Sequence, residues 1–197
     1  AESCMTISLL QQRENLLSDA TMIVADTNLS AEVLEWLNDF CRHNDKLLFI
    51  EPVSVLKAKK LQHIALDAVY MITPNEEELV SLFEDSLTEA EVIERLLLKG
   101  IKKIWLRRGE KGSEIISQNG VYSLPAVPVP VKDITGAGDA ALAAWLAAYF
   151  EGYTDAYCLK AAHAMAAAVI QVEGAVDANM SKDQLYKSVK NYFPDEY

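Results

Sequence analysis

The sequence predicts an α/β protein with three layers, α/β/α, built around a mostly parallel sheet. Short apolar runs alternate with longer amphipathic stretches along the whole chain, which is the order expected of strands joined by helices on both faces of a sheet. No internal repeat, low-complexity tract or long linker interrupts this alternation. We therefore expect residues 1–197 to form a single domain.

The first half of the chain supplies three strands and three helices. Residues 22–25 form an apolar run, and Ser30 is placed to cap a helix that continues to about residue 42. Residues 5–17 have the apolar spacing of a short helix. The other expected elements are strands at 47–50 and 69–72 and a helix that follows Asn75 through Leu79 and Phe83.

The second half begins with a helix whose start and end are both marked. Thr88 and Glu91 form a capping box, and Gly100 ends the helix at about residue 99. The remaining expected elements are a strand at 103–106, a hairpin of strands 113–117 and 120–124, and helices at 136–150, 154–172 and 181–192.

Polar residues follow several of the expected strands directly. They are the segments 26–28 and 51–52, Asn75 and the segment 107–109. Ligands of open parallel sheets bind beyond the carboxyl ends of the strands. We therefore expect these side chains to line one rim of the molecule.

Composition narrows the classes of function. The chain has 197 residues, of which 51% are hydrophobic, enough for one sizeable core. The net charge of −11 disfavours nucleic acid as a partner. No run approaches the roughly 18 apolar residues of a membrane span. Cys4, Cys41 and Cys158 lack metal or redox spacing, and free thiols fit a reducing, cytoplasmic location.

The segment 133–139 reads Asp-Ile-Thr-Gly-Ala-Gly-Asp and precedes a helix rich in small residues. Such a turn directs several backbone N–H groups at an anion. Asp139 lies beside that site and could accept a proton from an attacking hydroxyl. Phosphoryl transfer needs both groups and a metal ion. The alternative is an ordinary helix start, where an Asp is favoured by the helix dipole.

This segment resembles the signature of the PfkB (ribokinase-like) carbohydrate kinases, typically Asp-Thr-x-Gly-Ala-Gly-Asp. The resemblance implies a ribokinase-like fold and ATP-dependent transfer of the γ-phosphoryl group to a hydroxyl of a sugar or nucleoside. It assigns the anion hole to Gly136, Ala137 and Gly138 and the catalytic base to Asp139. Ile134 departs from the usual residue, but the family gives that side chain no chemistry.

Two further segments resemble nucleotide-binding motifs of the same family. Asn75 and Glu78 match Asn-x-x-Glu, which implies contacts to Mg²⁺ and the phosphates, largely through water. Arg107, Gly109 and Gly112 match Thr-x-Gly-x-x-Gly, with Arg107 in place of Thr and able to meet a phosphate directly. The alternatives are acidic residues in a first helical turn and a solvated basic loop.

The resemblance also implies a monovalent cation site for K⁺ and an adenine site. Asp133, Thr135 and Gly174 are the positions that carry the cation site, largely through carbonyl oxygens, in a region that continues into Ala175. His163 could border the adenine. The alternative is a helix histidine whose ring is satisfied within the protein.

Segments 25–30 and 51–58 look like those of pseudouridine kinase-type members. Asn28, Ser54 and Lys57 are then expected to contact the substrate or a phosphate, and pseudouridine is the expected acceptor. The alternative for Lys57 is a solvated helix face shared with Lys59 and Lys60.

The resemblance covers residues 21–192 and lacks the family's N-terminal strands, substrate motifs and β lid. We expect a C-terminal, ATP-binding part of a kinase that is weak or inactive alone, because reactant positioning supplies much of the rate. Strands that would pair with the missing part are left as edges, which a homodimer would cover.

Two other classes of function fit the sequence less well. A non-catalytic nucleotide- or sugar-binding regulatory module would need no base, so Asp139 counts against it. A dinucleotide-dependent oxidoreductase is disfavoured because the glycine turn falls late in the chain.

Overall fold

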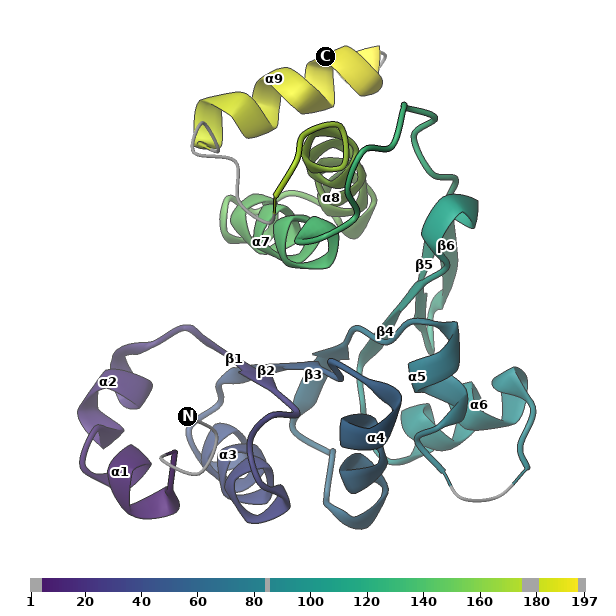
Figure 1. Cartoon of the computed structure of the whole chain (residues 1–197). Helices are drawn as coiled ribbons and strands as arrows, with labels where there is room; N and C mark the ends of the chain where they lie inside the picture. Colours follow the sequence, from purple (N-terminus) through teal and green to yellow (C-terminus); the bar gives the residue numbers. More distant parts are fainter. Residues whose placement is uncertain (1–4, 84–85, 175–180, 195–197) are drawn as a thin grey trace. The chain divides into compact units, whose positions relative to one another are not determined.

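The computed structural model describes residues 5–83, 86–174 and 181–194. The chain divides into two compact units (Figure 1). Unit 1 comprises Ala1–Arg108 and Glu114–Val121, and unit 2 comprises Gly109–Ser113 and Tyr122–Tyr197. The expectation of a single domain stays a prediction.

The strands form one six-stranded sheet in the order β1-β2-β3-β4-β5-β6. The first four are parallel neighbours, with Asp26 opposite Glu51 in the pairing of the first two. The bounds of the strands are β1 Met22–Asp26, β2 Leu47–Glu51, β3 Val69–Ile72, β4 Lys103–Arg107, β5 Ser113–Ser117 and β6 Gly120–Leu124.

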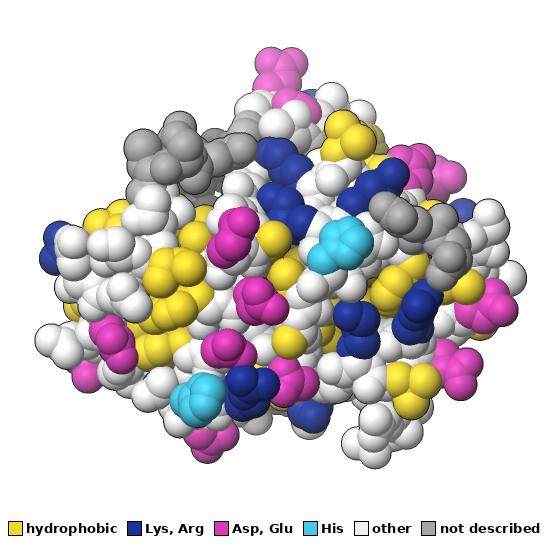
Figure 2. All heavy atoms as spheres, turned by 90° about the horizontal axis from the view of Figure 1, so that it is seen from below, with side chains coloured by type: hydrophobic (Ala, Val, Ile, Leu, Met, Phe, Trp, Pro, Cys, Tyr) yellow, Lys and Arg dark blue, Asp and Glu magenta, His cyan; other side chains and the backbone are white. Residues whose placement is uncertain are grey.

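The helices of unit 1 cover one face of its strands (Figure 1). Their bounds are α1 Ile7–Gln11, α2 Glu14–Asp19, α3 Ala31–His43, α4 Val55–Ala58, the 3-10 turn Lys59–His63, α5 Glu76–Val80 and α6 Glu89–Leu98. Leu34, Ile50 and Ile104 are among the residues of the apolar core, each no more than 1% exposed. Figure 2 shows basic and acidic side chains interspersed with hydrophobic patches on the helical face.

Side-chain caps set where these helices begin. Ser30 accepts a hydrogen bond from the N–H of Val33 at 3.3 Å, and Thr88 and Glu91 form the expected capping box. Gly100 follows α6 with a φ of 105°, and a Cβ there would lie 2.8 Å from the Cα of Asp67. A glycine is therefore required to end α6.

In its described part, unit 2 contains three helices, the ends of the hairpin, the short turn Gly109–Lys111 and the irregular segment 125–136. Its helices are α7 Ala137–Phe150, α8 Asp155–Val169 and α9 Lys182–Tyr192. Buried alanines line both long helices, with Trp145 fully buried among them and stacked on Tyr149. Small side chains let two helices approach closely. None of the described helices is long and apolar enough to cross a membrane.

The structure differs from the expected elements in three places. Residues 7–19 form two short helices, α1 and α2, in place of one. Helix α5 ends at Val80, where the Ser81 hydroxyl donates to the carbonyl of Glu78 at 2.7 Å and competes with a further turn. Helix α8 ends at Val169, because the carbonyl of Ile170 accepts from Lys132 at 2.7 Å.

Candidate active site

The carboxyl ends of the strands of unit 1 bring the expected polar residues to one edge. Asp26 and Glu51 are register partners at the ends of β1 and β2. Asn75, which follows β3, forms a parallel bridge with Arg107 at the end of β4, and the N–H of Arg107 donates to the carbonyl of Pro74 at 2.9 Å. The rim predicted from the sequence is therefore present within unit 1.

Arg107 lies between two carboxylates of this rim. Its Nη2 forms an ion pair with Glu51 and lies 3.8 Å from Oε2 of Glu78. The hydroxyl of Thr73 donates to the other oxygen of Glu51. Burial raises the pKa of Glu51, and the nearby Arg107 and Thr73 oppose that rise. Thr73 was not identified from the sequence, because nothing in its local pattern signals this contact.

Asn75 and Glu78 form a reciprocal capping box at the start of α5. The side chain of Asn75 accepts from the N–H of Glu78 at 2.8 Å, and Oε2 of Glu78 accepts from the N–H of Asn75 at 2.9 Å. Glu78 is only 4% exposed. This geometry is explained by the alternative reading, in which these residues serve the start of a helix. A carboxylate that accepts one hydrogen bond can still accept others from a ligand or its waters.

These residues fit a magnesium ion that arrives with a nucleotide. Among the described residues no group of three or more His, Cys, Asp or Glu side chains could hold a metal alone. Mg²⁺ commonly keeps several waters and takes one or two carboxylates together with substrate phosphates. Glu78, with Asn75 beside it, would supply that limited contribution.

Asn28 and Lys57, both expected at the substrate, lie in contact. The ammonium of Lys57 donates to the side-chain oxygen of Asn28, and Lys60 donates to the carbonyls of Thr27 and Leu29 at 2.7 Å each. Two lysines therefore hold the loop after β1. The alternative of a solvated helix face holds for Lys59, which is exposed. Lys60 was missed because the spacing of a lysine run does not show which members turn inward.

Ser54 follows a strained turn after β2. Val53 has a φ of 63°, and the N–H of Ser54 donates to the carbonyl of Pro52 at 2.7 Å, which makes a γ-turn. A positive φ is unfavourable for a β-branched residue. Ser54 then stands at the start of α4 without a side-chain capping bond. No sequence signal marks this turn.

In unit 2, the glycine turn leads into α7 as the sequence predicts. Gly136 has a φ of 79° and caps the helix. The first intrahelical bond runs from the N–H of Ala140 to the carbonyl of Gly136 at 2.9 Å. The N–H groups of Gly138 and Asp139 precede that bond, and such groups form an anion site at a helix start. Asp139 is exposed in the same first turn.

Asp133 ties the start of the glycine turn to the segment after α8. Its carboxylate accepts from the N–H of Thr135 at 2.9 Å and from the N–H of Gly174 at 3.1 Å. Hydrogen bonds from Thr135 and Gly174 lower the pKa of Asp133. The structure thus brings together Asp133, Thr135 and Gly174, the three positions expected at a monovalent cation. Ala175 lies outside the described residues.

His163 has partners for both ring nitrogens. Nδ1 is 3.1 Å from the carbonyl of Pro125, and Nε2 is 2.7 Å from the hydroxyl of Ser113. Because a carbonyl only accepts, Nδ1 carries the proton and Nε2 accepts from the hydroxyl. Burial lowers the pKa of His163 and favours this neutral form. The geometry fits the internally satisfied histidine, and contact with adenine stays a prediction.

Gly109 and Gly112 both belong to unit 2 and both have positive φ, 55° and 101°. The N–H of Gly112 donates to the carbonyl of Gly109 at 3.0 Å, which closes the loop between β4 and β5. A Cβ at Gly112 would lie 2.1 Å from the carbonyl oxygen of Leu124. Gly112 is thus required for a close backbone approach, whatever it contacts in a ligand.

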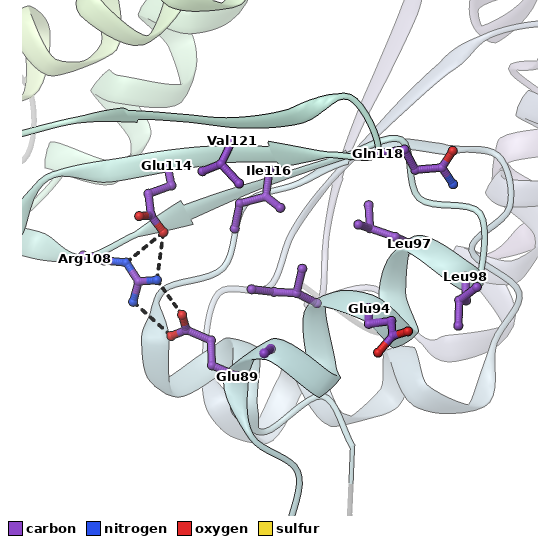
Figure 3. Close-up of a pocket in the computed structure, with 11 residues that line it drawn as sticks. Glu89, Glu94, Leu97, Leu98, Arg108, Glu114, Ile116, Gln118 and Val121 are labelled. Carbon is purple, nitrogen blue, oxygen red and sulfur yellow. Dashed lines mark hydrogen bonds and ion pairs between the residues drawn. The ribbon is translucent and has the colours of Figure 1, made fainter.

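Arg108 forms a second cluster that the sequence did not reveal. It pairs with Glu76 at 2.8 Å, Glu89 at 2.5 Å and Glu114 at 2.8 Å, from α5, α6 and β5. Figure 3 shows its guanidinium directed at Glu89 and Glu114 at one end of a groove between α6 and the hairpin. The groove has a volume of about 600 Å³. Arg108 therefore acts within unit 1 as a structural cross-link.

A family model identifies the family to which the chain belongs. The model of the pfkB family of carbohydrate kinases matches residues 1–182. The chain belongs to this family. The Escherichia coli pseudouridine kinase is 26% identical over 196 residues, which are 96% of this chain and 61% of that enzyme.

Solved structures of pfkB-like kinases share the fold. The Arabidopsis thaliana ribokinase, solved with ribose and ATP, has a TM-score of 0.75 at 22% identity, over 94% of this chain and 60% of that one. An Escherichia coli protein described as a putative ribokinase II was solved with ATP and Mg²⁺. It has a TM-score of 0.79 at 22% identity, over 90% of this chain and 61% of that one. The predicted α/β/α ribokinase-like fold is confirmed. The chain spans about 60% of the length of these relatives.

Proposed function

We propose that the protein containing this chain is an ATP-dependent kinase that transfers the γ-phosphoryl group to a hydroxyl of a sugar or nucleoside. The observation that carries the proposal is the start of α7. Gly136 has a left-handed backbone conformation at the start of the helix. The N–H groups of Gly138 and Asp139 come before the first intrahelical hydrogen bond, and the side chain of Asp139 beside them is exposed. Membership of the pfkB family supports it.

Each group has a distinct role in the proposed reaction. Asp139 accepts the proton of the attacking hydroxyl. The N–H groups of Gly138 and Asp139, in the turn that begins at Gly136, stabilise the negative charge that develops on the transferred group, whereas the N–H of Ala137 is bonded to the carbonyl of Ile134. Glu78 and Asn75 would hold, through water, a magnesium ion bound with ATP, and the ion would supply neutralisation of phosphate charge. The 109–112 loop borders the phosphates, and Asp133, Thr135 and Gly174 frame a K⁺ site.

The proposed acceptor is pseudouridine. The similarity to the Escherichia coli pseudouridine kinase extends over 96% of the chain, which supports this choice above a general sugar. Asn28, Ser54 and Lys57 would contact the acceptor or a phosphate. Lys57 is held by Asn28, so its charge is in a defined place before any ligand arrives.

Replacement of the base tests the proposal. In the protein that contains this chain, Asp139→Asn is expected to lower ATP turnover with pseudouridine about 10²- to 10⁴-fold while leaving nucleotide affinity nearly unchanged. Asp183→Asn is the matched control, because it removes an exposed carboxylate from the first turn of α9. Turnover and nucleotide binding would be measured on a panel of pseudouridine, other nucleosides and ribose.

The panel also separates the alternative. Absence of turnover on every acceptor, with nucleotide bound tightly, would overturn the kinase and favour a regulatory binding module. Turnover with ribose but not pseudouridine would retain the kinase and correct the acceptor.

A further inference from the structure

In the rim of unit 1, Arg107 lies between a partly buried carboxylate, Glu51, and a buried one, Glu78. The side chains of Arg107, Glu51 and Glu78 are 21%, 18% and 6% exposed. Glu51 receives the ion pair with Arg107 and the hydroxyl of Thr73. Burial disfavours the charged form of Glu51, and Arg107 and Thr73 are the neighbours that favour it, so an ionised Glu51 depends on Arg107.

The hold of Arg107 on Glu78 is much looser. The Nη2 to Oε2 separation of 3.8 Å is beyond hydrogen-bond length, so the interaction there is electrostatic. Within the described part of the chain, the Nε of Arg107 is buried and has no hydrogen-bond partner. Arg107 is therefore anchored at Glu51, has an unused donor, and lends its charge to Glu78.

The charge of Arg107 affects whether a divalent cation can bind at the rim. The inference rests on the proposed function, because it takes Glu78 to lie near the magnesium of the nucleotide. A guanidinium charge 3.8 Å from Glu78 opposes the approach of a second cation to that carboxylate. Nucleotide phosphates would offset the repulsion, because a triphosphate carries more negative charge than one divalent cation neutralises.

We propose that Arg107 is a positioning residue that keeps Glu78 from binding a free divalent cation, so that the cation binds at the rim only together with a nucleotide. Arg107 stays on Glu51 throughout, and its positive charge attracts the phosphates when the nucleotide arrives. The Thr that the related motif carries at this position has no charge and would not impose this order.

A metal titration without nucleotide tests the role of Arg107. Mn²⁺ binding to the chain would be measured by electron paramagnetic resonance. Arg107→Gln is expected to tighten Mn²⁺ binding roughly tenfold, the effect typical of removing one nearby like charge. Lys102→Gln is the matched control, because it removes one positive charge from an exposed residue just before the other end of β4. It should change the affinity less than twofold.

Two double variants guard against a folding defect and locate the site. Glu51→Gln with Arg107→Gln removes both members of the ion pair, leaves no lone buried carboxylate at position 51, and should still bind Mn²⁺ more tightly than the parent. Glu78→Gln with Arg107→Gln should return the affinity to the parent value. The inference is overturned if neither Arg107 variant tightens binding, or if Lys102→Gln tightens it equally.

Binding of MgATP to the parent chain, followed in parallel by fluorescence of a nucleotide analogue, keeps the two proposals apart. Failure of the parent to bind nucleotide would count against the proposed function. Unchanged Mn²⁺ affinity in a parent and variants that all bind nucleotide would count against the role of Arg107 alone.

Discussion

Gly109 and Gly112 belong to the same motif, but the structure requires a glycine at only one of the two positions. At Gly109 a Cβ would meet no heavy atom within 4 Å, and the φ of 55° is one that Asn tolerates. At Gly112 a Cβ would collide with the backbone of Leu124, Pro125 and Ala126. Only the second position is closed to any side chain.

The two substitutions should therefore differ in their cost. Gly112→Ala is expected to lower the free energy of unfolding by about 3 kcal/mol, and Gly109→Asn by less than about 1 kcal/mol. Urea denaturation followed by circular dichroism would measure both. Equal losses would show that the close approach at Gly112 does not decide its identity.

His163 should give the stability of unit 2 a dependence on pH. Burial places the folded-state pKa of His163 below its ordinary value of about 6.5. Below about pH 6.5 the unfolded state then binds more protons than the folded state, so the free energy of unfolding falls as pH decreases. Above that pH both states are neutral at this residue.

Thermal unfolding between pH 7.5 and pH 5.5 would reveal the effect. The wild-type chain should lose more stability on acidification than His163→Gln, whose amide can keep a donor and an acceptor. Identical pH profiles for the two proteins would contradict the assignment of a neutral imidazole between Pro125 and Ser113.

At the scale of elements, Arg108 joins α5, α6 and β5 through three carboxylates. Its side chain is 19% exposed, whereas those of Glu76, Glu89 and Glu114 are 41%, 36% and 27% exposed. Partial exposure of the partners weakens each pair, but a guanidinium that serves three carboxylates forms a network.

We expect Arg108→Met to lower the free energy of unfolding by about 1–2 kcal/mol. Arg42→Met is the comparison, because Arg42 pairs with Asp39 and Asp67 while all three side chains are more than two-fifths exposed. It should cost less than about 1 kcal/mol. A larger loss at Arg42 than at Arg108, measured by urea denaturation, would refute the cross-link.

At the scale of the whole molecule, the sequence predicted the elements well because their signals are local. The caps at Ser30, Asn75 and Thr88 lie within three residues of the groups that they bind. The rim was also predictable, since the carboxyl ends of parallel strands share an edge.

The contacts that escaped prediction join residues far apart in the chain. Thr73 reaches Glu51 across 22 positions and Lys60 reaches Thr27 across 33, and no spacing rule connects them. The turn at Val53 escaped because a positive φ at a β-branched residue contradicts its intrinsic preference. The division into two compact units has no composition shift or linker to announce it.

The adjacent arginines of β4 and the loop after it carry a consequence for annotation. The side chains of neighbouring residues on an extended chain point to opposite sides. Arg107 pairs with Glu51 in the rim, whereas Arg108 pairs with Glu114 in the hairpin. An alignment displaced by one position would still show an arginine in the column of the rim residue, yet it would be the wrong one. Identity of the letter is therefore no guarantee of the role when functions are transferred between sequences at this position.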